Sequence, residues 1–426
     1  MSEPPGASPP PVLTSGRGTV ARKRWRRPGA RARLGGRQWA LAGAVAAAGT
    51  VLGGILLVGM AVPATAAASG TWSVVPSPNI GRDGTELLSD SCLSASFCMA
   101  TGLYLNSSTR SGLWPAAERW DGHRWSVVPA PELGPPAEDN VMSAISCTAT
   151  TACMAVGSSG DSALAMQWDG TRWSGVHVPA GDDELNAIAC TSAVACVAVG
   201  WKEGSTHQME ALAERWDGTG WTVMAVPDPG PESQYSTGGD AQAELTGVYC
   251  TSPKWCMAVG SSTGANAPTE RALSELWDGT KWSLGSSPGG LGSAPDAVSC
   301  PSAVYCLAVG SGPQLESWDG ARWSAVSSAY KNPPHDSAGL AAVSCYSVHS
   351  CLAVGYKGVV PNGSGCCRAP LVESWDGSKT SVVPPHYDLG YLAGLAAVSC
   401  APAGPCVAVG STGQGAPGAR SLIEMS

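Results

Sequence analysis

Hydrophobic and polar positions follow one repeated pattern along most of this chain, clearest between Leu185 and Pro227. Small apolar residues end at a cysteine, and a second cysteine, after five intervening residues, opens an apolar Val-Ala-Val-Gly segment. An alternating Leu-x-Glu-x-Trp segment and Asp-Gly follow, and a last tryptophan opens a short apolar run that stops at proline. The pattern predicts four strands per unit: one of small residues, one buried on both faces, one half-buried, and one at an edge, where proline is tolerated.

Paired cysteines mark seven copies of this unit. The pairs recur every ~51 residues on average, a spacing typical of propeller blades. They are Cys92/Cys98, Cys147/Cys153, Cys190/Cys196, Cys250/Cys256, Cys300/Cys306, Cys345/Cys351 and Cys400/Cys406. Trp-Asp-Gly occurs six times, at Trp120, Trp168, Trp216, Trp277, Trp318 and Trp375. A second tryptophan stands five residues after the first in five of these copies, and Thr380 replaces it in the sixth.

The two ends of the repeat account for the missing seventh Trp-Asp-Gly. The C-terminal residues 421–426 contain the Leu-x-Glu strand and stop where Trp-Asp-Gly should begin, and residues 69–76 supply the fourth strand that this last unit lacks. An open stack of units would leave two exposed edges. We therefore predict an all-β fold, a seven-bladed β-propeller of four-stranded blades, closed into a ring when the N-terminal strand completes the last blade.

Cysteines that flank a five-residue hairpin loop face each other on adjacent strands, at a separation that suits a disulfide. Disulfides persist in exported proteins, and on the chain-entropy model such a short loop contributes on the order of 2 kcal/mol per bridge. Zinc is the rival interpretation, but a zinc site needs four converging ligands, and these pairs belong to seven separate units. We predict seven structural disulfides and no metal. For Cys366 and Cys367, in the longest loop between a second and a third strand, a vicinal disulfide, a bridge to a partner and a loop staple all stay open.

The acidic residues of the repeat are predicted to be structural. The aspartate of Trp-Asp-Gly can accept backbone N–H groups within its turn, where glycine can take positive φ; a sugar or calcium site in each blade is the alternative. Catalytic carboxylates are normally singular, so a glutamate repeated on the third strand indicates a hydrogen-bond acceptor within or between blades. No catalytic motif is present and no cofactor is predicted. The repeated position holds Glu118, Met166, Glu214, Glu275, Glu316, Glu373 and Glu424.

Charge divides the chain into three segments. Residues 1–38 carry nine Lys or Arg and one acid, and their composition predicts a disordered basic N-terminus on the cytoplasmic side. Residues 39–68 hold an uncharged stretch long enough to span a bilayer, then a small-residue segment, so a cleaved signal peptide and an uncleaved anchor both stay open. Residues 69–426 are the predicted propeller, secreted or held at the cell surface. Their 16 basic and 32 acidic residues give a net charge of −16, which disfavours nucleic acid as a partner.

Function is expected on one face of the ring. The loops within the cysteine pairs and after Trp-Asp-Gly are nearly constant in length, whereas those after the second strand and between units vary widely. Variable loops on a rigid scaffold are where binding residues concentrate. Aromatic rings outside the repeat pattern stand in this variable part and suit sugar rings or peptide segments. Our candidate ligand-binding residues are Trp114, Trp201, Tyr235, Tyr356 and Tyr391.

The repeat resembles secreted bacterial β-propellers. Its Trp-Asp-Gly-x-x-Trp turn is similar to the turn of tectonin-like and fucose-binding propeller lectins, and to the Asp-box of sialidases, although it is one residue shorter between Asp and Trp. The lectin resemblance implies binding pockets between blades, and the sialidase resemblance implies an arginine triad with a Tyr/Glu pair. The seven cysteine pairs depart from the lectin pattern, and the sialidase residues find no match here, so no site residue is carried over.

Three functions follow as expectations. The first is a non-enzymatic exported propeller that binds an extracellular glycan or protein through its variable loops, with a membrane contact through the N-terminal segment if that segment is uncleaved. The second is a glycan-cleaving, sialidase-like hydrolase, which needs acids and arginines clustered at the centre of the ring. The third is a structural assembly module.

Overall fold

A computed structural model of the protein describes residues 72–81, 83–105, 112–133, 139–179, 181, 183–204, 208–227, 242–264, 267–286, 294–331, 337–359, 367–384, 393–401, 404–413 and 419–426. They belong to one compact unit, Ala64–Ser426, and their regular structure consists of strands. Among these residues there is no helix with the length and apolar character needed to cross a bilayer. The predicted basic segment 1–38 and the segment 39–68 lie outside the described residues.

The strands form seven antiparallel sheets of four, and each sheet is one blade. Blade 1 contains β2 (Gly84–Ser94), β3 (Phe97–Leu105), β4 (Leu113–Trp120) and β5 (Trp125–Val127). Blade 2 contains β6 (Asn140–Ala149), β7 (Ala152–Ser159), β8 (Ser162–Trp168) and β9 (Trp173–Val176). Blade 3 contains β10 (Asp183–Ser192), β11 (Ala195–Glu203), β12 (Met209–Trp216) and β13 (Trp221–Met224).

The remaining blades repeat this order. Blade 4 contains β14 (Gln242–Ser252), β15 (Trp255–Gly264), β16 (Ala267–Trp277) and β17 (Trp282–Leu284). Blade 5 contains β18 (Pro295–Ser302), β19 (Tyr305–Gly310), β20 (Gln314–Trp318) and β21 (Trp323–Val326). Blade 6 contains β22 (Ala338–Ser347), β23 (Ser350–Val359), β24 (Cys367–Trp375) and β25 (Thr380–Val382). Blade 7 contains β26 (Ala393–Cys400), β27 (Cys406–Thr412), β28 (Arg420–Met425) and β1 (Ser73–Val74).

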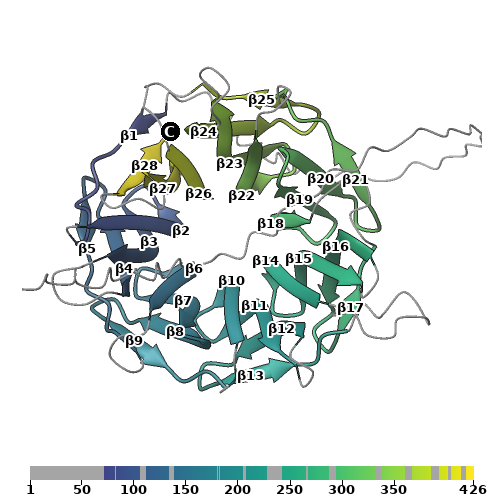
Figure 1. Ribbon diagram of the computed structural model, residues 1–426, viewed down its shortest axis with the longest axis horizontal. Coiled ribbons are helices and arrows are strands. Elements are labelled where there is room, and N and C mark those ends of the chain that lie inside the picture. The colour runs from purple at the N-terminus through teal and green to yellow at the C-terminus, as the bar shows by residue number, and fades with distance from the viewer. Residues whose placement is uncertain are drawn as a thin grey trace, which may run out of the picture. The chain divides into compact units, whose positions relative to one another are not determined.

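The ring closes as the sequence predicts. Figure 1 shows the blades around a common axis in chain order, with the first strand of each blade innermost and the fourth outermost. In blade 7 the outermost strand is β1, which pairs antiparallel with β28 through Ser73–Met425 and Val74–Glu424. The N–H of Val75 extends this pairing by donating to the carbonyl oxygen of Ile423 at 2.9 Å. The prediction of a seven-bladed propeller closed by its N-terminal strand is therefore confirmed.

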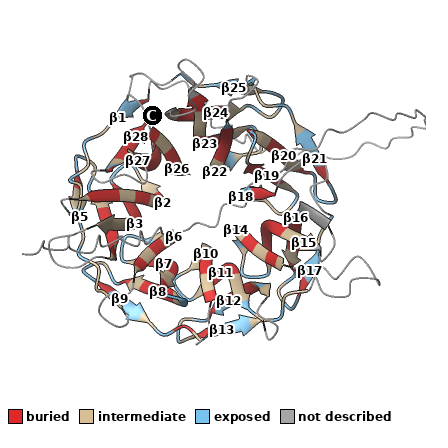
Figure 2. Ribbon diagram, in the orientation of Figure 1, coloured by how far each residue is buried: buried red, intermediate tan, exposed pale blue. Residues whose placement is uncertain are grey.

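Burial decreases from the second strand outward, with one departure from the predicted pattern (Figure 2). The second strands are buried on both faces, as expected; Cys196 to Gly200 are buried throughout. The third strands are not half-buried. In β12, Leu212, Ala213 and Glu214 are all at most 1% exposed. Among the last five residues of this strand, 212–216, only Arg215 is exposed to solvent. The alternation in the sequence was misleading because the glutamate is itself a core residue.

A β-bulge recurs in the first strand of every blade and explains the glycine of Ala-Val-Gly. In blade 3 the register shifts between Leu185 and Ala187, opposite Gly200. A Cβ added at Gly200 would stand 1.9 Å from the carbonyl oxygen of Glu184. At the seven equivalent glycines this distance lies between 1.9 and 2.7 Å, so no side chain fits there. The glycines are Gly102, Gly157, Gly200, Gly260, Gly310, Gly355 and Gly410.

Serines link the innermost strands of successive blades. At five of the seven junctions, the leading cysteine of one blade donates its N–H to the serine before the leading cysteine of the previous blade, at 2.9–3.2 Å. The bond from Cys92 to Ser399 joins blade 1 to blade 7 and so completes the ring at 2.9 Å. Ala189 and Tyr249 occupy the serine position at the other two junctions.

All seven predicted disulfides form, each across the hairpin between a first and a second strand. The second cysteine of each bridge lies at the start of the buried second strand, and its sulfur belongs to the core: Cys98 and Cys306 are 0% exposed and Cys351 is 3% exposed. The bridges therefore stabilise the scaffold from within. They are Cys92–Cys98, Cys147–Cys153, Cys190–Cys196, Cys250–Cys256, Cys300–Cys306, Cys345–Cys351 and Cys400–Cys406.

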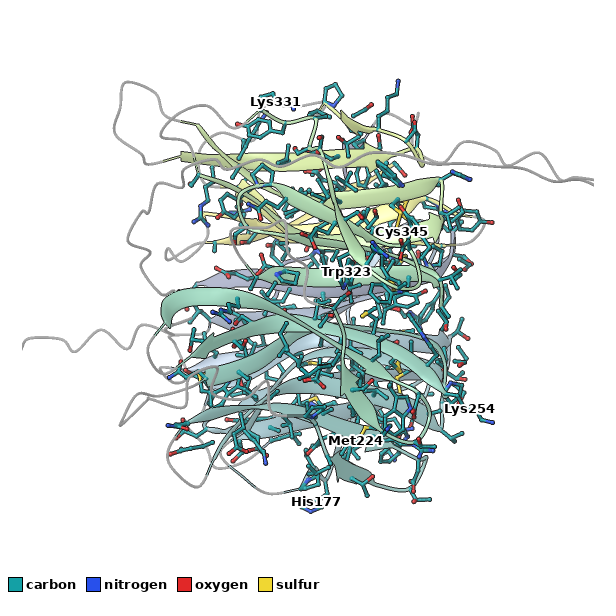
Figure 3. The ribbon with its side chains drawn as sticks, turned by 90° about the vertical axis from the view of Figure 1, so that its right-hand side faces the viewer. His177, Met224, Lys254, Trp323, Lys331 and Cys345 are labelled. Atoms are coloured by element: carbon teal, nitrogen blue, oxygen red, sulfur yellow. A yellow bond between two sulfur atoms is a disulfide. The ribbon has the colours of Figure 1, made fainter. Side chains whose placement is uncertain are left out.

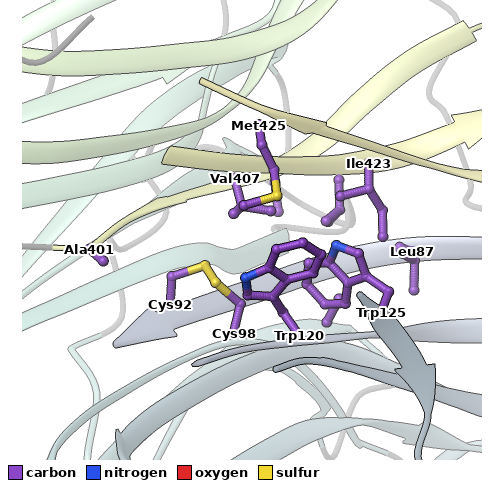
Figure 4. Close-up of a cluster of buried hydrophobic side chains, with 12 residues drawn as sticks. Leu87, Cys92, Cys98, Trp120, Trp125, Ala401, Val407, Ile423 and Met425 are labelled. Carbon is purple, nitrogen blue, oxygen red and sulfur yellow. A yellow bond between two sulfur atoms is a disulfide. The ribbon is translucent and has the colours of Figure 1, made fainter. Parts of the chain in front are cut away.

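The tryptophans pack between blades, as predicted. Figure 4 shows Trp120 and Trp125 of blade 1 against Val407, Ile423 and Met425 of blade 7. Both rings are at most 8% exposed, so they belong to the core and are not open to a ligand.

The Trp-Asp-Gly turn is built by its own aspartate, as expected for a structural role. Asp169 accepts hydrogen bonds from the N–H groups of Thr171 and Arg172 at 2.8 and 2.9 Å, and Gly170 has φ +96°. The six turns share this arrangement. The Thr171 hydroxyl and the turn N–H groups lower the pKa of Asp169 to about 2.

Candidate functional site: the variable-loop face

The two kinds of loop lie on opposite faces of the ring. The loop between the first and second strands lies beside the Trp-Asp-Gly turn, because Trp120 Nε1 donates to the carbonyl of Ala95 at 3.0 Å, and Trp216 Nε1 to that of Ala193 at 3.2 Å. We call this side the constant face; Lys254 marks it at the right-hand edge of Figure 3. The connections after the second strand and between blades lie at the other strand ends and form the variable-loop face.

The disulfide cysteines that the sequence marks as site residues are not part of the variable-loop face. Their hairpins lie at the constant face. Eleven of the fourteen cysteines are buried, and Cys190, Cys250 and Cys400 are partly exposed. The cysteine pairs thus differ from the aromatic candidates, because they hold the hairpins of the scaffold at the opposite face.

Trp201 lies on strand β11 rather than in a loop. It is the first residue after Ala-Val-Gly, is half-buried, and pairs in register with Glu184 on β10. Its Nε1 donates to Glu184 Oε2 at 3.3 Å. The carboxylate thus holds an aromatic ring at the variable-loop end of the innermost strand of blade 3.

Tyr356 occupies the same repeat position in blade 6, on β23. The guanidinium carbon of Arg368 lies 4.2 Å from the centre of its ring, a cation–π contact. Two glycines lie beside this side chain: a Cβ at Gly339 would be in van der Waals contact with Tyr356 Cε1 at 3.4 Å, and one at Gly394 of blade 7 with Tyr356 Cβ at 3.6 Å. Trp201 and Tyr356 therefore stand on well-separated blades of one face, each beside a charged group.

Within the described part of the chain, the structure establishes no charged neighbour for the other three aromatic candidates, Trp114, Tyr235 and Tyr391. Trp114 lies on β4 and packs against Tyr104 across the strand pair, with ring centres 6.0 Å apart, so its ring is partly used within blade 1. Tyr235 and Tyr391 lie outside the described residues, and so does Cys366. Cys367 begins β24, opposite Val359. The described candidates are thus at strand ends in blades 1, 3 and 6, and the structure does not bring them together.

Acidic residues predominate on the variable-loop face. Among described residues this face carries eleven acids and six bases, a difference of −5. Three of the acids, Glu86, Glu184 and Glu244, precede the bulge of the innermost strand in blades 1, 3 and 4, where blades 6 and 7 have Gly339 and Gly394. The acids are Asp83, Glu86, Glu132, Asp139, Asp161, Asp183, Glu184, Glu203, Glu210, Glu244 and Asp296, and the bases are Lys202, Arg271, Lys331, Lys357, Arg368 and Arg420.

All six repeated glutamates are buried, and the contacts of four of them define two groups. The hydroxyl of Ser77 donates to the carboxylate of Glu118 and lies 2.9 Å from each of its oxygens. Glu373 accepts hydrogen bonds from the N–H groups of Ala329 and Tyr330, at 3.2 and 3.1 Å, and from the hydroxyl of Ser328. Ser77 and Ser328 both follow the outermost strand of the preceding blade, five residues after its tryptophan. The predicted role as an acceptor between blades is confirmed for these two glutamates.

Glu214 and Glu275 form the second group. Val178 and Val226 occupy the serine position opposite them, and neither carboxylate has a hydrogen-bond partner among the described residues. Burial raises the pKa of Glu275 to about 8 and, together with nearby Asp183, that of Glu214 to about 7. In blade 2 an apolar residue stands at each of the two positions: Met166 replaces the glutamate and Ala130 replaces the serine, and both belong to the same hydrophobic cluster.

Asp90 is a buried carboxylate that the sequence analysis did not single out. It stands on β2 where the other six blades have Ile or Val, such as Ile188 and Val398, and it faces blade 7. Its Oδ1 has no hydrogen-bond partner among described residues, and burial raises its pKa well above the ordinary value, opposed by the backbone N–H of Ser399. Aligning the seven units position by position was the signal that could have found it.

Asp90→Val is expected to stabilise the oxidised domain by about 1 kcal/mol at pH 7, because it removes a buried carboxyl and restores the aliphatic residue of the other blades. Asp90→Asn keeps a polar group in place and should bring no gain. Thermal unfolding of the two variants beside the wild type measures this. A loss of stability in Asp90→Val would contradict it and show that the carboxyl has a structural role.

The fold, rather than the sequence, connects this chain with known proteins. No protein-family model and no curated protein matches the sequence. Among solved structures, a protein described as YCF48 bound to D1 peptide matches with a TM-score of 0.53 and 11% identity over 84% of this chain and 98% of that chain. The WD40 repeats of RRP9 match with a TM-score of 0.53 and 9% identity over 85% and 99%. YCF48 from Cyanidioschyzon merolae gives 0.51 and 11% over 84% and 98%.

The likeness is one of fold. At this identity a shared propeller carries no residue roles from one chain to the other, and propellers serve as scaffolds for many functions. The site of this propeller therefore has to be argued from its own side chains.

Proposed function

We propose that the exported propeller binds a positively charged segment of another protein on its variable-loop face. The excess of acids on that face supports this, because it attracts Lys and Arg side chains and repels anionic sugars. Trp201 with Glu184 beside it offers an aromatic face and a carboxylate together, which suits an ammonium or guanidinium group. A peptide-bound propeller among the solved structures is in keeping with this ligand class.

An uncharged glycan would use the aromatic rings but not the acids. A sialidase-like enzyme would need arginines near the ring axis, whereas the described arginines of this face, Arg271, Arg368 and Arg420, stand in the first half of third strands in three blades. The arrangement therefore favours a protein partner without catalysis over the two glycan hypotheses.

Trp201→Ala and Glu184→Gln are each expected to weaken peptide binding about tenfold, since each removes one half of the proposed cation site. The measurement is an array of peptides of graded charge, probed with the oxidised domain 69–426, followed by titration of the best binders at two salt concentrations. Preference for Lys- and Arg-containing peptides, weakened by salt, is the expected result.

Tyr346→Ala is the matched control, because Tyr346 is a 52% exposed aromatic residue of the constant face, away from the proposed peptide site. A glycan array run in parallel tests the alternative. Glycan binding without peptide binding, or peptide binding indifferent to charge, would overturn the proposal.

A further inference from the structure

The constant face combines exposed apolar and basic side chains in one sector of the ring. Val304 at the loop tip of blade 5 is 66% exposed, and Tyr346, which follows Cys345 near the end of β22 in blade 6, is 52% exposed. Four exposed cations stand among them on blades 4, 5 and 6. We call these six residues the basic–apolar sector: Lys254, Lys281, Val304, Arg322, Tyr346 and Lys379.

The cations of this sector form no ion pair within the described part of the chain, although Lys281, Arg322 and Lys379 each lie near enough to the aspartate of their own turn to interact with it electrostatically. The ion pairs of the constant face, within the part of the chain that the structure describes, are Arg124–Asp121 and Arg172–Asp169 in blades 1 and 2. Near the sector, Asp278, Asp319 and Asp376 each turn one oxygen inward to two backbone N–H groups. Lysine and arginine side chains reach farther from the backbone than aspartate does, so they are the outermost charges.

The two faces carry opposite charge. The described residues of the constant face include eight bases and six acids, a difference of +2, against −5 on the variable-loop face. The bases are Arg119, Arg124, Arg172, Arg215, Lys254, Lys281, Arg322 and Lys379, and the acids are the six aspartates of Trp-Asp-Gly. Although residues 69–426 carry a net charge of −16, charges more than about 10 Å away are screened by salt, so an anionic planar surface would interact mainly with the nearer face and orient the ring with its constant face inward.

The chain also enters the ring on the constant face. Trp72, the first described residue, takes the place of the second tryptophan of a Trp-Asp-Gly turn, and β1 runs from there toward the variable-loop face. In the sequence only residues 63–71 separate Trp72 from the uncharged stretch 39–62. Nine residues reach at most ~30 Å, so with an uncleaved anchor this face lies next to the bilayer.

From these observations we propose that the constant face docks on an anionic lipid surface through the basic–apolar sector. The cations contact headgroup phosphates, Val304 and Tyr346 enter the interfacial layer, and the variable-loop face is left pointing away from the membrane. Three separate observations support this proposal: the positive charge of the constant face, its exposed apolar side chains, and the entry of the chain on that face. The proposal does not rest on the proposed peptide ligand.

The test uses the oxidised domain 69–426, whose ring is complete within residues 72–426. It is sedimented with vesicles of phosphatidylcholine mixed with phosphatidylglycerol, and with vesicles of phosphatidylcholine alone. We expect binding to the anionic vesicles that falls with added salt. The combined variant Lys281→Glu, Arg322→Glu and Lys379→Glu should bind at least about tenfold more weakly.

A matched reversal on the other face, Lys357→Glu with Arg420→Glu, should leave vesicle binding unchanged. Val304→Ser with Tyr346→Ser removes the apolar part without adding charge and should also reduce binding; melting temperatures confirm that each variant is folded. Absence of wild-type binding to anionic vesicles at low salt, or an equal loss in both charge-reversed variants, would overturn the proposal.

Discussion

Gly200→Ala is expected to lower the free energy of unfolding by about 3 kcal/mol or more, although it adds a single methyl group. The new Cβ would lie 1.9 Å from the carbonyl oxygen of Glu184 and 3.0 Å from Leu185 Cα. Both are backbone atoms of the bulge, so no side chain can rotate away to make room. Relief requires the first and second strands of blade 3 to separate, with loss of ladder hydrogen bonds in a fully buried layer.

Gly220→Ala is the control for this change. Gly220 stands in the Trp-Asp-Gly turn of the same blade, and a Cβ there meets no atom within 4 Å. Arg172 and Lys281 occupy its position in neighbouring blades, so alanine should change stability by less than about 0.5 kcal/mol. Melting temperatures of the two oxidised variants decide the matter. Equal effects of the two substitutions would show that the bulge does not impose glycine.

Glu275→Met is expected to stabilise the protein above pH 8, whereas Glu373→Met should destabilise it. The folded pKa of Glu275, about 8, lies above the ordinary value of 4.5. A raised folded pKa contributes stability below pH 4.5 that is lost as pH rises toward 8. Methionine has no carboxyl to ionise, so the variant does not lose this stability, which is on the order of 2 kcal/mol or more. Blade 2 already has a buried methionine, Met166, at this position.

Glu373 receives hydrogen bonds from Ser328, Ala329 and Tyr330. Methionine would leave these donors without an acceptor, at a cost of about 2 kcal/mol. The measurement is chemical denaturation of both variants and the wild type at pH 5, 7 and 9. A gain in Glu275→Met that is the same at every pH would contradict titration of a buried carboxyl, and a gain in Glu373→Met would contradict the acceptor role.

The architecture could be predicted because it depends on repetition. Seven cysteine pairs, six Trp-Asp-Gly turns and complementary ends fix the number of blades, the strands of each blade and the closure of the ring. Repetition also identified Asp and Glu as structural, since a residue needed in every blade belongs to the scaffold. The third strand is buried rather than half-buried, because its repeated glutamate faces the neighbouring blade whether or not that blade offers a hydrogen-bond donor, as Glu373 and Glu214 show.

The candidate site could be predicted only in part, because it rests on departures from the repeat. Trp201 and Tyr356 were chosen as loop aromatics, yet both are strand residues at one shared position after Ala-Val-Gly. Their charged neighbours, Glu184 and Arg368, come from the adjacent first and third strands, and a linear sequence does not show such cross-strand pairs until the register is known. Tyr235 and Tyr391 stay predictions.

Pairing of β1 with β28 constrains when the ring can close during synthesis. Residues 73–74 are made before every other strand, but their partners, residues 420–425, are made after every other strand. Until then β1 has no sheet to join, and afterwards only β1 covers the outer edge of β28 in blade 7. Each hairpin disulfide, by contrast, closes over a sequence separation of 6 and can form as its blade appears. Oxidation blade by blade would thus hold an unfinished ring in register while it waits for its final strand.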